Sequence, residues 1–449
     1  TTINQLNFVA LGRYDRDTVV REASLYKLRI LKDVTDGTPK SVRRRPSIAS
    51  TGRPATAEEI IRYLNLPPID EEMRLGTLID TDIPVCFSMR IMMHHVLTAG
   101  STGSGKSNTI ANSIKGAQQM GACCILLDHK PDYQDMEKPN DEGWQPHFQG
   151  LQNISYWSLG DSNRRQETPI NVLASDVDPT VLAASIFYNY NENLQAENLD
   201  TLLLNFRDER REEGEYDWTW DKFARSIPSS AEKAKAQYGD MIDGKSYGAM
   251  MRKLSKAGRV PQWIKGTSYG GGHFSDPEFN LEKLIEPGRI IVIRIAANAG
   301  GGRGYGLFLS FLLRKVYELK ASKKITCPIA TFIDEAQDIF NAGRTFRDAA
   351  AGMLSENIRK GRSMKIGYMI GVQSADTVPE EIRNNLNSQL IHRHNNSSQA
   401  SEAMQRASKE QLAMTDTFGP GECLAYLFGS NAVVHCQMRQ SPFMLTKND

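Results

Sequence analysis

The feature that most constrains the fold of this chain is an eight-residue run at 100–107, with the sequence GSTGSGKS. It matches the pattern G-x-x-x-x-G-K-[ST] at every specified position. Apolar Val96-Leu97 precedes the run. Ile110, Ile114 and Ala117 follow it at the spacing of one face of a helix. The sequence therefore predicts a loop that joins a strand to an amphipathic helix, which is the context that phosphate binding requires.

The composition of this loop suits a nucleotide. Its glycines let backbone N–H groups wrap around phosphates, and the positive end of the helix dipole faces them. We expect Lys106 to bridge the β- and γ-phosphates of ATP and the Ser107 hydroxyl to bind Mg²⁺. ATP and Mg²⁺ are the predicted cofactors. The predicted nucleotide contacts are Gly100, Ser101, Thr102, Gly103, Ser104, Gly105, Lys106, Ser107 and Asn108.

Two adjacent carboxylates, Asp334 and Glu335, follow the apolar segment 329–333. Open α/β sheets bind ligands at the edge where the strands end. We expect Asp334 to hold the Mg²⁺ shell, and Glu335 to orient and partly deprotonate the attacking water. The alternative is that both acids merely begin a helix, where negative charge favours the dipole.

A third polar side chain, Gln373, follows the apolar segment 366–372. Its amide is placed to sense a γ-phosphate or the attacking water. The alternative is that a polar residue stands there because a loop begins. The predicted catalytic set from the residues alone is Lys106, Glu335 and Gln373.

Six apolar segments have the length and composition of strands buried on both faces. They are 96–99, 123–127, 290–295, 329–333, 365–372 and 389–392. Helical signals alternate with them, which predicts an α/β fold with a central, mainly parallel sheet. The segments 422–428 and 432–438, separated by Gly429-Ser430-Asn431, predict a β-hairpin.

We expect a small β-rich N-terminal region with a linker at 1–75 and a core at 76–449. A helical insertion at 178–284 is predicted within the core, beginning at Asp178-Pro179. The tryptophans of the insertion, including Trp218 and Trp220, are expected to pack in its core. The glycine-rich run 298–306 is typical of a flexible connection, with a loop that lines a pore as the alternative.

The net charge of +1, from 54 basic and 53 acidic residues, neither requires nor excludes a nucleic-acid partner. The six cysteines include no pair with the spacing of a metal site, which favours reduced, buried thiols. No apolar run has the length of a membrane span, and the first residues lack the features of a signal peptide. We therefore expect a cytoplasmic protein with no membrane partner.

Together these elements resemble the HerA family of ring-forming ATPases in the HerA/FtsK group. The resemblance extends from about residue 75 to the C-terminus. The segments that carry it most specifically are 99–108, 332–336 and 358–362. Segments 75–80, 371–374 and 419–422, together with His95, also look like family positions. One departure is 128–133, sequence DHKPDY, where relatives often have a His-Gly-Glu-Tyr-like run.

The resemblance implies a RecA-like core in a homo-hexameric ring around double-stranded DNA. ATP would bind between subunits, and its hydrolysis would drive translocation. Arg359 and Arg362 fall where the family supplies an arginine finger to the neighbouring subunit's γ-phosphate. The sequence does not choose between them, and a solvated basic helix end is the alternative. Since only about 75 residues precede the matching region, the family's N-terminal β-barrel is expected to be reduced or partial.

Two functions follow as the main hypotheses, and a conjugation-type coupling or secretion ATPase is a third, which the absence of a membrane segment disfavours. The first is a DNA-translocating motor that acts with an effector, either a nuclease or an NAD-consuming sirtuin-like enzyme, in DNA end processing or antiviral defence. The second is a hexameric scaffold that assembles and activates an effector under the control of nucleotide, without processive movement of DNA. The sequence does not identify the effector.

Overall fold

The computed structural model describes residues 55–446, except 161–166, 188, 257–258, 267–278, 296–300, 341–343, 395–399 and 401–403. The chain divides into two compact units, Thr1–Asn65 and Leu66–Asp449. In the first unit, the described residues form helix α2 (Ala57–Leu64), which begins with a capping box between Thr56 and Glu59. The rest of the predicted β-rich N-terminal region, up to residue 54, lies outside the described residues.

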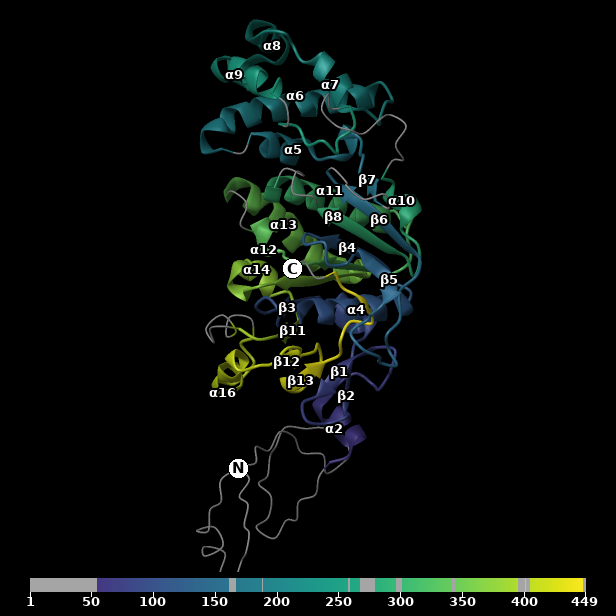
Figure 1. The fold of residues 1–449 in the computed structure, drawn as a ribbon. Coiled ribbons are helices and arrows are strands. Elements are labelled where there is room, and N and C mark those ends of the chain that lie inside the picture. The colour runs from purple at the N-terminus through teal and green to yellow at the C-terminus, as the bar shows by residue number, and fades with distance from the viewer. Residues whose placement is uncertain are drawn as a thin grey trace, which may run out of the picture. The chain divides into compact units, whose positions relative to one another are not determined.

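The second unit is built on one large mixed sheet (Figure 1). Within the described residues it has twelve strands in the order β2-β1-β13-β12-β11-β3-β10-β9-β4-β8-β6-β7. They are β1 (Arg74–Leu78), β2 (Pro84–Cys86), β3 (Val96–Ala99), β4 (Cys123–Asp128), β6 (Ile154–Leu159), β7 (Thr168–Pro169), β8 (Ile290–Ile295), β9 (Ile329–Ile333), β10 (Ile366–Val372), β11 (Ser388–Ile391), β12 (Glu422–Tyr426) and β13 (Val434–Met438). A separate small sheet pairs β5 (Asp135–Pro139) with β14 (Phe443–Met444).

The centre of the sheet is parallel, as the sequence predicts. Strands β11, β3, β10, β9, β4 and β8 pair in parallel, while β12, β13, β1 and β2 extend the sheet with antiparallel pairs. Every residue of β3, β4, β9 and β10 is buried. This burial on both faces explains why these strands read as unbroken apolar runs. The six predicted strands and the C-terminal hairpin are thus confirmed, with boundaries shifted by one or two residues.

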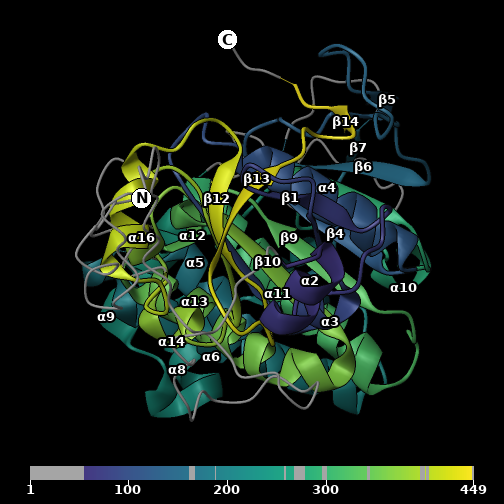
Figure 2. The same ribbon diagram turned by 90° about the horizontal axis from the view of Figure 1, so that it is seen from below.

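Helices cover both faces of the sheet (Figure 2). Helix α4 (Lys106–Gln119) lies on one face against β3, β4, β9 and β10, while α11 (Gly301–Ala321) and α13 (Arg344–Gly361) lie on the other. The chain moves across the sheet in opposite directions from β3 to β4 and from β8 through β9 to β10. Because crossover connections are right-handed, this reversal places α4 opposite α11 and α13. The shorter helices are α3 (Met89–Met93), α10 (Leu281–Leu284), α12 (Gln337–Phe340), α14 (Glu380–Arg383) and α16 (Lys409–Ala413).

The stretch between β7 and β8 is helical, as predicted. Its helices are α5 (Pro179–Ile186), α6 (Asn193–Glu212), α7 (Trp220–Ser226), α8 (Ala231–Tyr238) and α9 (Gly244–Leu254). Asp178 caps the first of them by accepting from the Val181 N–H at 3.2 Å. Trp218 and Trp220 are buried and pack edge-on against Phe206 and Phe223, so their predicted core position is confirmed. Helix α5 contacts α11, which joins this layer to the core.

Two expectations were incomplete or wrong. Strands β1, β2, β5, β6, β7 and β14 were not predicted; β6, the longest of them, is only half buried at its start, and its serines interrupt the apolar pattern. The run 298–306 was expected to be a flexible connection, but helix α11 begins at Gly301. Burial of the apolar residues that follow, such as Leu307 and Phe308, outweighs the conformational freedom of the glycines.

Candidate nucleotide-hydrolysis site

The predicted phosphate loop joins β3 to α4. Gly103 and Gly105 both have positive φ, of 74° and 105°, which L side chains rarely adopt. A Cβ at Gly100 would lie 2.7 Å from His392 Cβ and 2.7 Å from Ser104 Oγ. These glycines therefore allow a tight turn that leads directly into the first turn of α4, where N–H groups are free to face an anion.

Two segments distant in sequence support this loop. Ser101 donates its N–H and its hydroxyl to the Arg393 carbonyl, at 2.9 and 3.1 Å. Gly421 donates its N–H to the Ser104 carbonyl at 2.9 Å, and a Cβ at Gly105 would lie 2.8 Å from Gly421. The close approach of two glycines gives a physical reason for the segment 419–422, which the family resemblance marks.

His392, directly after β11, was not singled out from the sequence. Its Nε2 lies 3.1 Å from the hydroxyl of Thr109 on α4, and the ring is fully buried. Burial and the charge of Lys106 lower the pKa of His392 to about 3, so the ring is neutral at physiological pH. Its position at the end of a predicted strand was the available signal.

The residues at the start of α4 have different environments. Lys106 is buried and donates from Nζ to the Gly100 carbonyl at 3.1 Å, across the mouth of the loop. Ser107 is half-buried, and Thr102 and Gly103 form the exposed tip. The Asn108 side chain faces away from the loop, because its Oδ1 accepts from the Ser441 N–H at 3.0 Å. The predicted nucleotide contact of Asn108 stays a prediction, and its Oδ1 is engaged by the C-terminal segment.

Asp334 directly follows β9 at the same edge of the sheet and is 5% exposed. Tyr133 donates its hydroxyl to Asp334 Oδ2 at 3.0 Å, and the Glu335 N–H donates to Oδ1 at 2.9 Å. Gly371 on β10 permits this position, since a Cβ there would lie 2.7 Å from Oδ1. Burial raises the pKa of Asp334, and the positive charge of Lys106 opposes that rise.

Glu335 lies beside Asp334, with a left-handed φ of 52°. Its Oε1 accepts from Lys130 Nζ at 2.5 Å, and its Oε2 accepts from Gln373 Nε2 at 3.1 Å and from Gln337. Burial would raise the pKa of Glu335, but the hydrogen bond from Lys130 and the charge of Lys106 outweigh it, and the pKa falls below its usual value. The structure thus brings together Lys106, Asp334, Glu335 and Gln373, as expected from the parallel strands.

The segment 128–133, whose role the sequence left in doubt, lines this cluster. Asp128, which ends β4, accepts from the N–H groups of Asp132 and Tyr133, both at 3.3 Å. These bonds hold the turn that directs Lys130 and Tyr133 toward the two carboxylates. Burial and the neighbouring Asp334 raise the pKa of Asp132 to about 6. The signal in the sequence was a strand that ends in Asp128 and is followed by charged residues.

Arg359 and Arg362 do not join the cluster. Both are exposed, the first in the last turn of α13 and the second just before β10. The carboxylate cluster lies beyond the other end of β10, about 20 Å away at the usual rise of a strand. Both arginines therefore lie at the edge of the sheet opposite to the phosphate loop of the same chain.

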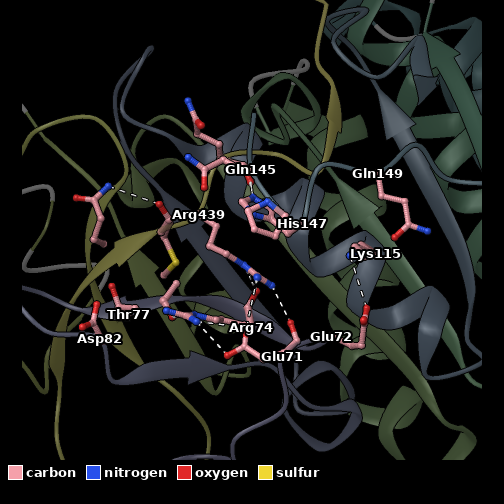
Figure 3. Close-up of a pocket in the computed structure, with 15 residues that line it drawn as sticks. Glu71, Glu72, Arg74, Thr77, Asp82, Lys115, Gln145, His147, Gln149 and Arg439 are labelled. Atoms are coloured by element: carbon pink, nitrogen blue, oxygen red, sulfur yellow. Dashed lines mark hydrogen bonds and ion pairs between the residues drawn. The ribbon is translucent and has the colours of Figure 1, made fainter. Parts of the chain in front are cut away.

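A polar pocket of about 610 Å³ lies on the outer side of α4 and β1, and no residue of the phosphate loop lines it (Figure 3). Four of its charged side chains pair with one another: Arg74 with Glu71 at 3.0 Å and Lys115 with Glu72 at 3.6 Å. Arg439 donates to the carbonyls of Arg74 and Glu71 at 2.9 and 3.0 Å. These contacts fasten the C-terminal segment to β1.

The fold and the site define a class. A glycine-rich loop between strand and helix, a lysine at its end and a buried Asp-Glu pair that follows a parallel strand of the same sheet form the site of a P-loop ATPase. The chain belongs to the family described as "Helicase HerA, central domain", whose model matches residues 73–299, about half of its length.

Named relatives agree with this family. The chain is similar to the DNA double-strand break repair helicase HerA of Sulfolobus acidocaldarius, with 21% identity over 337 residues. The match covers 71% of this chain and 59% of that protein. The chain therefore spans less than two thirds of the length of that relative. The protein of the same description from Saccharolobus solfataricus is 28% identical over 89 residues, which cover 20% of this chain and 18% of that protein.

Solved structures agree on the fold. VirB4 of Thermoanaerobacter pseudethanolicus superposes with a TM-score of 0.54 at 13% identity, covering 84% of this chain and 98% of that one. The plasmid coupling protein TrwB in complex with ADP and Mg²⁺ superposes with a TM-score of 0.54 at 12% identity, covering 84% and 92%. At these identities the likeness is one of fold. In the described part of this chain, no helix is long and apolar enough to cross a membrane.

Proposed function

We propose that this chain hydrolyses ATP in the presence of Mg²⁺ and uses the energy to translocate double-stranded DNA through a homo-hexameric ring. The observation that carries the proposal is the convergence of Lys106, Asp334 and Glu335 at one edge of the sheet, with Glu335 held by Gln373. Named relatives described as DNA repair helicases support the DNA substrate. We further propose that residues 76–449 form the motor core, with 178–284 inserted in it.

Each residue has a distinct task in this proposal. The N–H groups of 100–105 and the N-terminus of α4 bind the phosphates, and Lys106 leaves the Gly100 carbonyl to neutralise the β- and γ-phosphates. Ser107 and Asp334 would hold Mg²⁺, and the ion would neutralise negative charge on the phosphate oxygens. Buried Asp334 fits a cation, since burial alone disfavours its negative charge.

Hydrolysis follows from position and charge. Glu335 accepts a proton from the attacking water as the water oxygen bonds to the γ-phosphorus and the bond to the β-phosphate oxygen breaks. Gln373 holds Glu335 and lies beside the attacking water. Arg359 or Arg362 of a neighbouring subunit stabilises the charge on the γ-phosphate, because each lies too far from the loop of its own subunit. The monomer is accordingly a poor ATPase.

The test measures ATP turnover and movement on DNA with the same protein. We expect long linear duplex DNA to stimulate turnover, and the protein to displace a third strand annealed to that duplex in a triplex displacement assay. Glu335→Gln should bind ATP but lower turnover by about a hundredfold or more. Lys106→Ala should lose both binding and turnover.

The outcomes separate the two functions. If the rate of ATP turnover is the same with and without duplex DNA, and the third strand is not displaced, the result would favour the nucleotide-controlled scaffold over the motor. Intact hydrolysis in both Lys106→Ala and Glu335→Ala would make the site assignment wrong. The effector, a nuclease or an NAD-consuming sirtuin-like enzyme, in end processing or antiviral defence, would be identified by co-purification with the intact cytoplasmic protein.

A further inference from the structure

The carboxylate of Glu335, which the proposed hydrolysis requires, forms an ion pair with Lys130. Lys130 Nζ lies 2.5 Å from Glu335 Oε1, and the second oxygen, Oε2, accepts from Gln373 and Gln337. Both oxygens of Glu335 are therefore engaged by donors. A carboxylate that is to take a proton from water needs a lone pair that the water can reach.

The two partners differ in exposure. The side chain of Glu335 is 8% exposed, whereas that of Lys130 is 45% exposed. The lysine thus covers the carboxylate from its solvent side. Among the described residues, no hydrogen bond to any other group holds the Lys130 ammonium, so its long side chain is free to move once this pair breaks.

The second lysine of the site behaves differently. Lys106 is 6% exposed and is held by the Gly100 carbonyl. When Lys106 leaves this carbonyl for the phosphates, no carboxylate is uncovered. Lys130 lies in the turn after β4, and Gln373 directly follows β10. Because β4 and β10 pair with opposite edges of β9, the two side chains reach Glu335 from opposite sides.

We propose that Lys130 restrains hydrolysis by holding Glu335 until the γ-phosphate of bound ATP draws the ammonium away. The inference rests on the proposed role of Glu335. A terminal phosphate carries more negative charge than a carboxylate, so it competes for a mobile ammonium. Departure of Lys130 uncovers Oε1, so that the attacking water can reach this oxygen and transfer a proton to it. Lys130 is in this sense a positioning residue, which acts through Glu335.

The experiment compares Lys130→Met, which keeps the length of the side chain but removes the charge, with Lys130→Arg, which keeps the ion pair. We expect Lys130→Met to raise kcat in the absence of DNA about two- to fivefold, as loss of a partly exposed ion pair implies. KM for ATP should change less than kcat. Lys130→Arg should keep kcat at the wild-type value, because it keeps the ion pair. Lys324→Met is the matched control, because Lys324 forms an exposed pair with Glu282 at 2.8 Å outside the site.

Each other result has one meaning. A lower kcat in Lys130→Met would overturn the restraint and make Lys130 a support of hydrolysis, and an unchanged kcat would overturn it as well. A rise in KM without a rise in kcat would instead make Lys130 a permanent nucleotide contact. Wild-type turnover in Glu335→Gln would refute the proposed role of Glu335 in hydrolysis. This result is distinct from a failure of the proposed restraint by Lys130, which only the Lys130 variants test.

Discussion

At the scale of single residues, the acidic pair is organised by groups from another strand. Asp334 accepts a hydrogen bond from the Tyr133 hydroxyl, and Glu335 accepts one from the Lys130 ammonium. Both donors lie in the turn after β4. The hydroxyl lowers the pKa of Asp334 against the stronger effect of burial. The ionisation of Asp334, the proposed Mg²⁺ ligand, thus depends in part on Tyr133, which is not proposed to bind the ion.

Tyr133→Phe tests this dependence. The variant keeps the ring but leaves Asp334 Oδ2 without its donor, so the carboxylate becomes harder to ionise and a weaker ligand. We expect the Mg²⁺ concentration for half-maximal ATP turnover to rise about tenfold, since a hydrogen bond to a charged group contributes on the order of 1.5–3 kcal/mol. Titration of MgCl₂ at fixed ATP measures it. An unchanged Mg²⁺ requirement would show that Tyr133 only fills space.

Gly100→Ala tests the packing beneath the phosphate loop. The new Cβ would lie 2.7 Å from His392 Cβ and Ser104 Oγ, so the loop has to shift. We expect the Kd of a fluorescent ATP analogue to rise at least tenfold, with stability lowered by about 1–3 kcal/mol. Gly248→Ala is the control, because a Cβ at this position in α9 meets no atom within 4 Å. Tight binding by Gly100→Ala would mean that the loop adapts freely.

At the scale of elements, a buried ion pair fastens the helical insertion. Glu192 is 2% exposed, and its carboxylate accepts from Lys253 at the end of α9, at 2.6 Å, and from Arg259, at 3.2 Å. Burial would raise the pKa of Glu192, but these donors lower it from 4.5 to about 2. The ionised form is therefore strongly favoured by the folded state.

Glu192→Gln should lower the free energy of unfolding by about 2–3 kcal/mol at pH 7, since it removes one partner of a buried pair. The folded-state pKa is depressed, so the contribution is complete above pH 4.5 and disappears as the pH falls toward about 2. Urea unfolding at pH 7 and pH 3 measures the difference between variant and wild type, which should shrink at the lower pH. Glu282→Gln, in an exposed pair, should change stability by less than about 1 kcal/mol.

At the scale of the whole molecule, the position of the two arginines supports the proposed ring. Arg359 and Arg362 lie at the edge of the sheet opposite to their own phosphate loop. An arginine that acts on the γ-phosphate must then come from a neighbour. The proposed ring thus follows from the distance within one chain together with the proposed role of these residues.

Mixing inactive variants tests the shared site. One of Arg359→Ala and Arg362→Ala should abolish turnover while ATP binding remains. Mixed with Lys106→Ala in equal amounts, that variant should regain about a quarter of wild-type turnover if subunits assort at random, because some interfaces combine an intact loop with an intact arginine. Arg225→Ala, at an exposed position of the insertion, serves as the control. Absence of recovery at any ratio would argue against action between subunits.

Local patterns in the sequence by themselves determined the central strands, the phosphate loop and the acidic pair. A strand buried on both faces must be apolar throughout, and a phosphate loop needs glycines and a lysine at fixed spacing. The parallel order of the strands then implied that Asp334, Glu335 and Gln373 lie at the edge that also carries Lys106. Those inferences need no knowledge of distant contacts.

Only the tertiary structure decided what surrounds these residues. Lys130 meets Glu335, His392 meets Thr109 and Gly421 meets Gly105 across separations of hundreds of residues, and no local period encodes such contacts. The same holds for α11, whose glycine-rich start is helical because the following residues are buried. The identity of the site is thus a property of short segments, whereas the environment of Glu335, the proposed catalytic carboxylate, depends on how the whole chain packs.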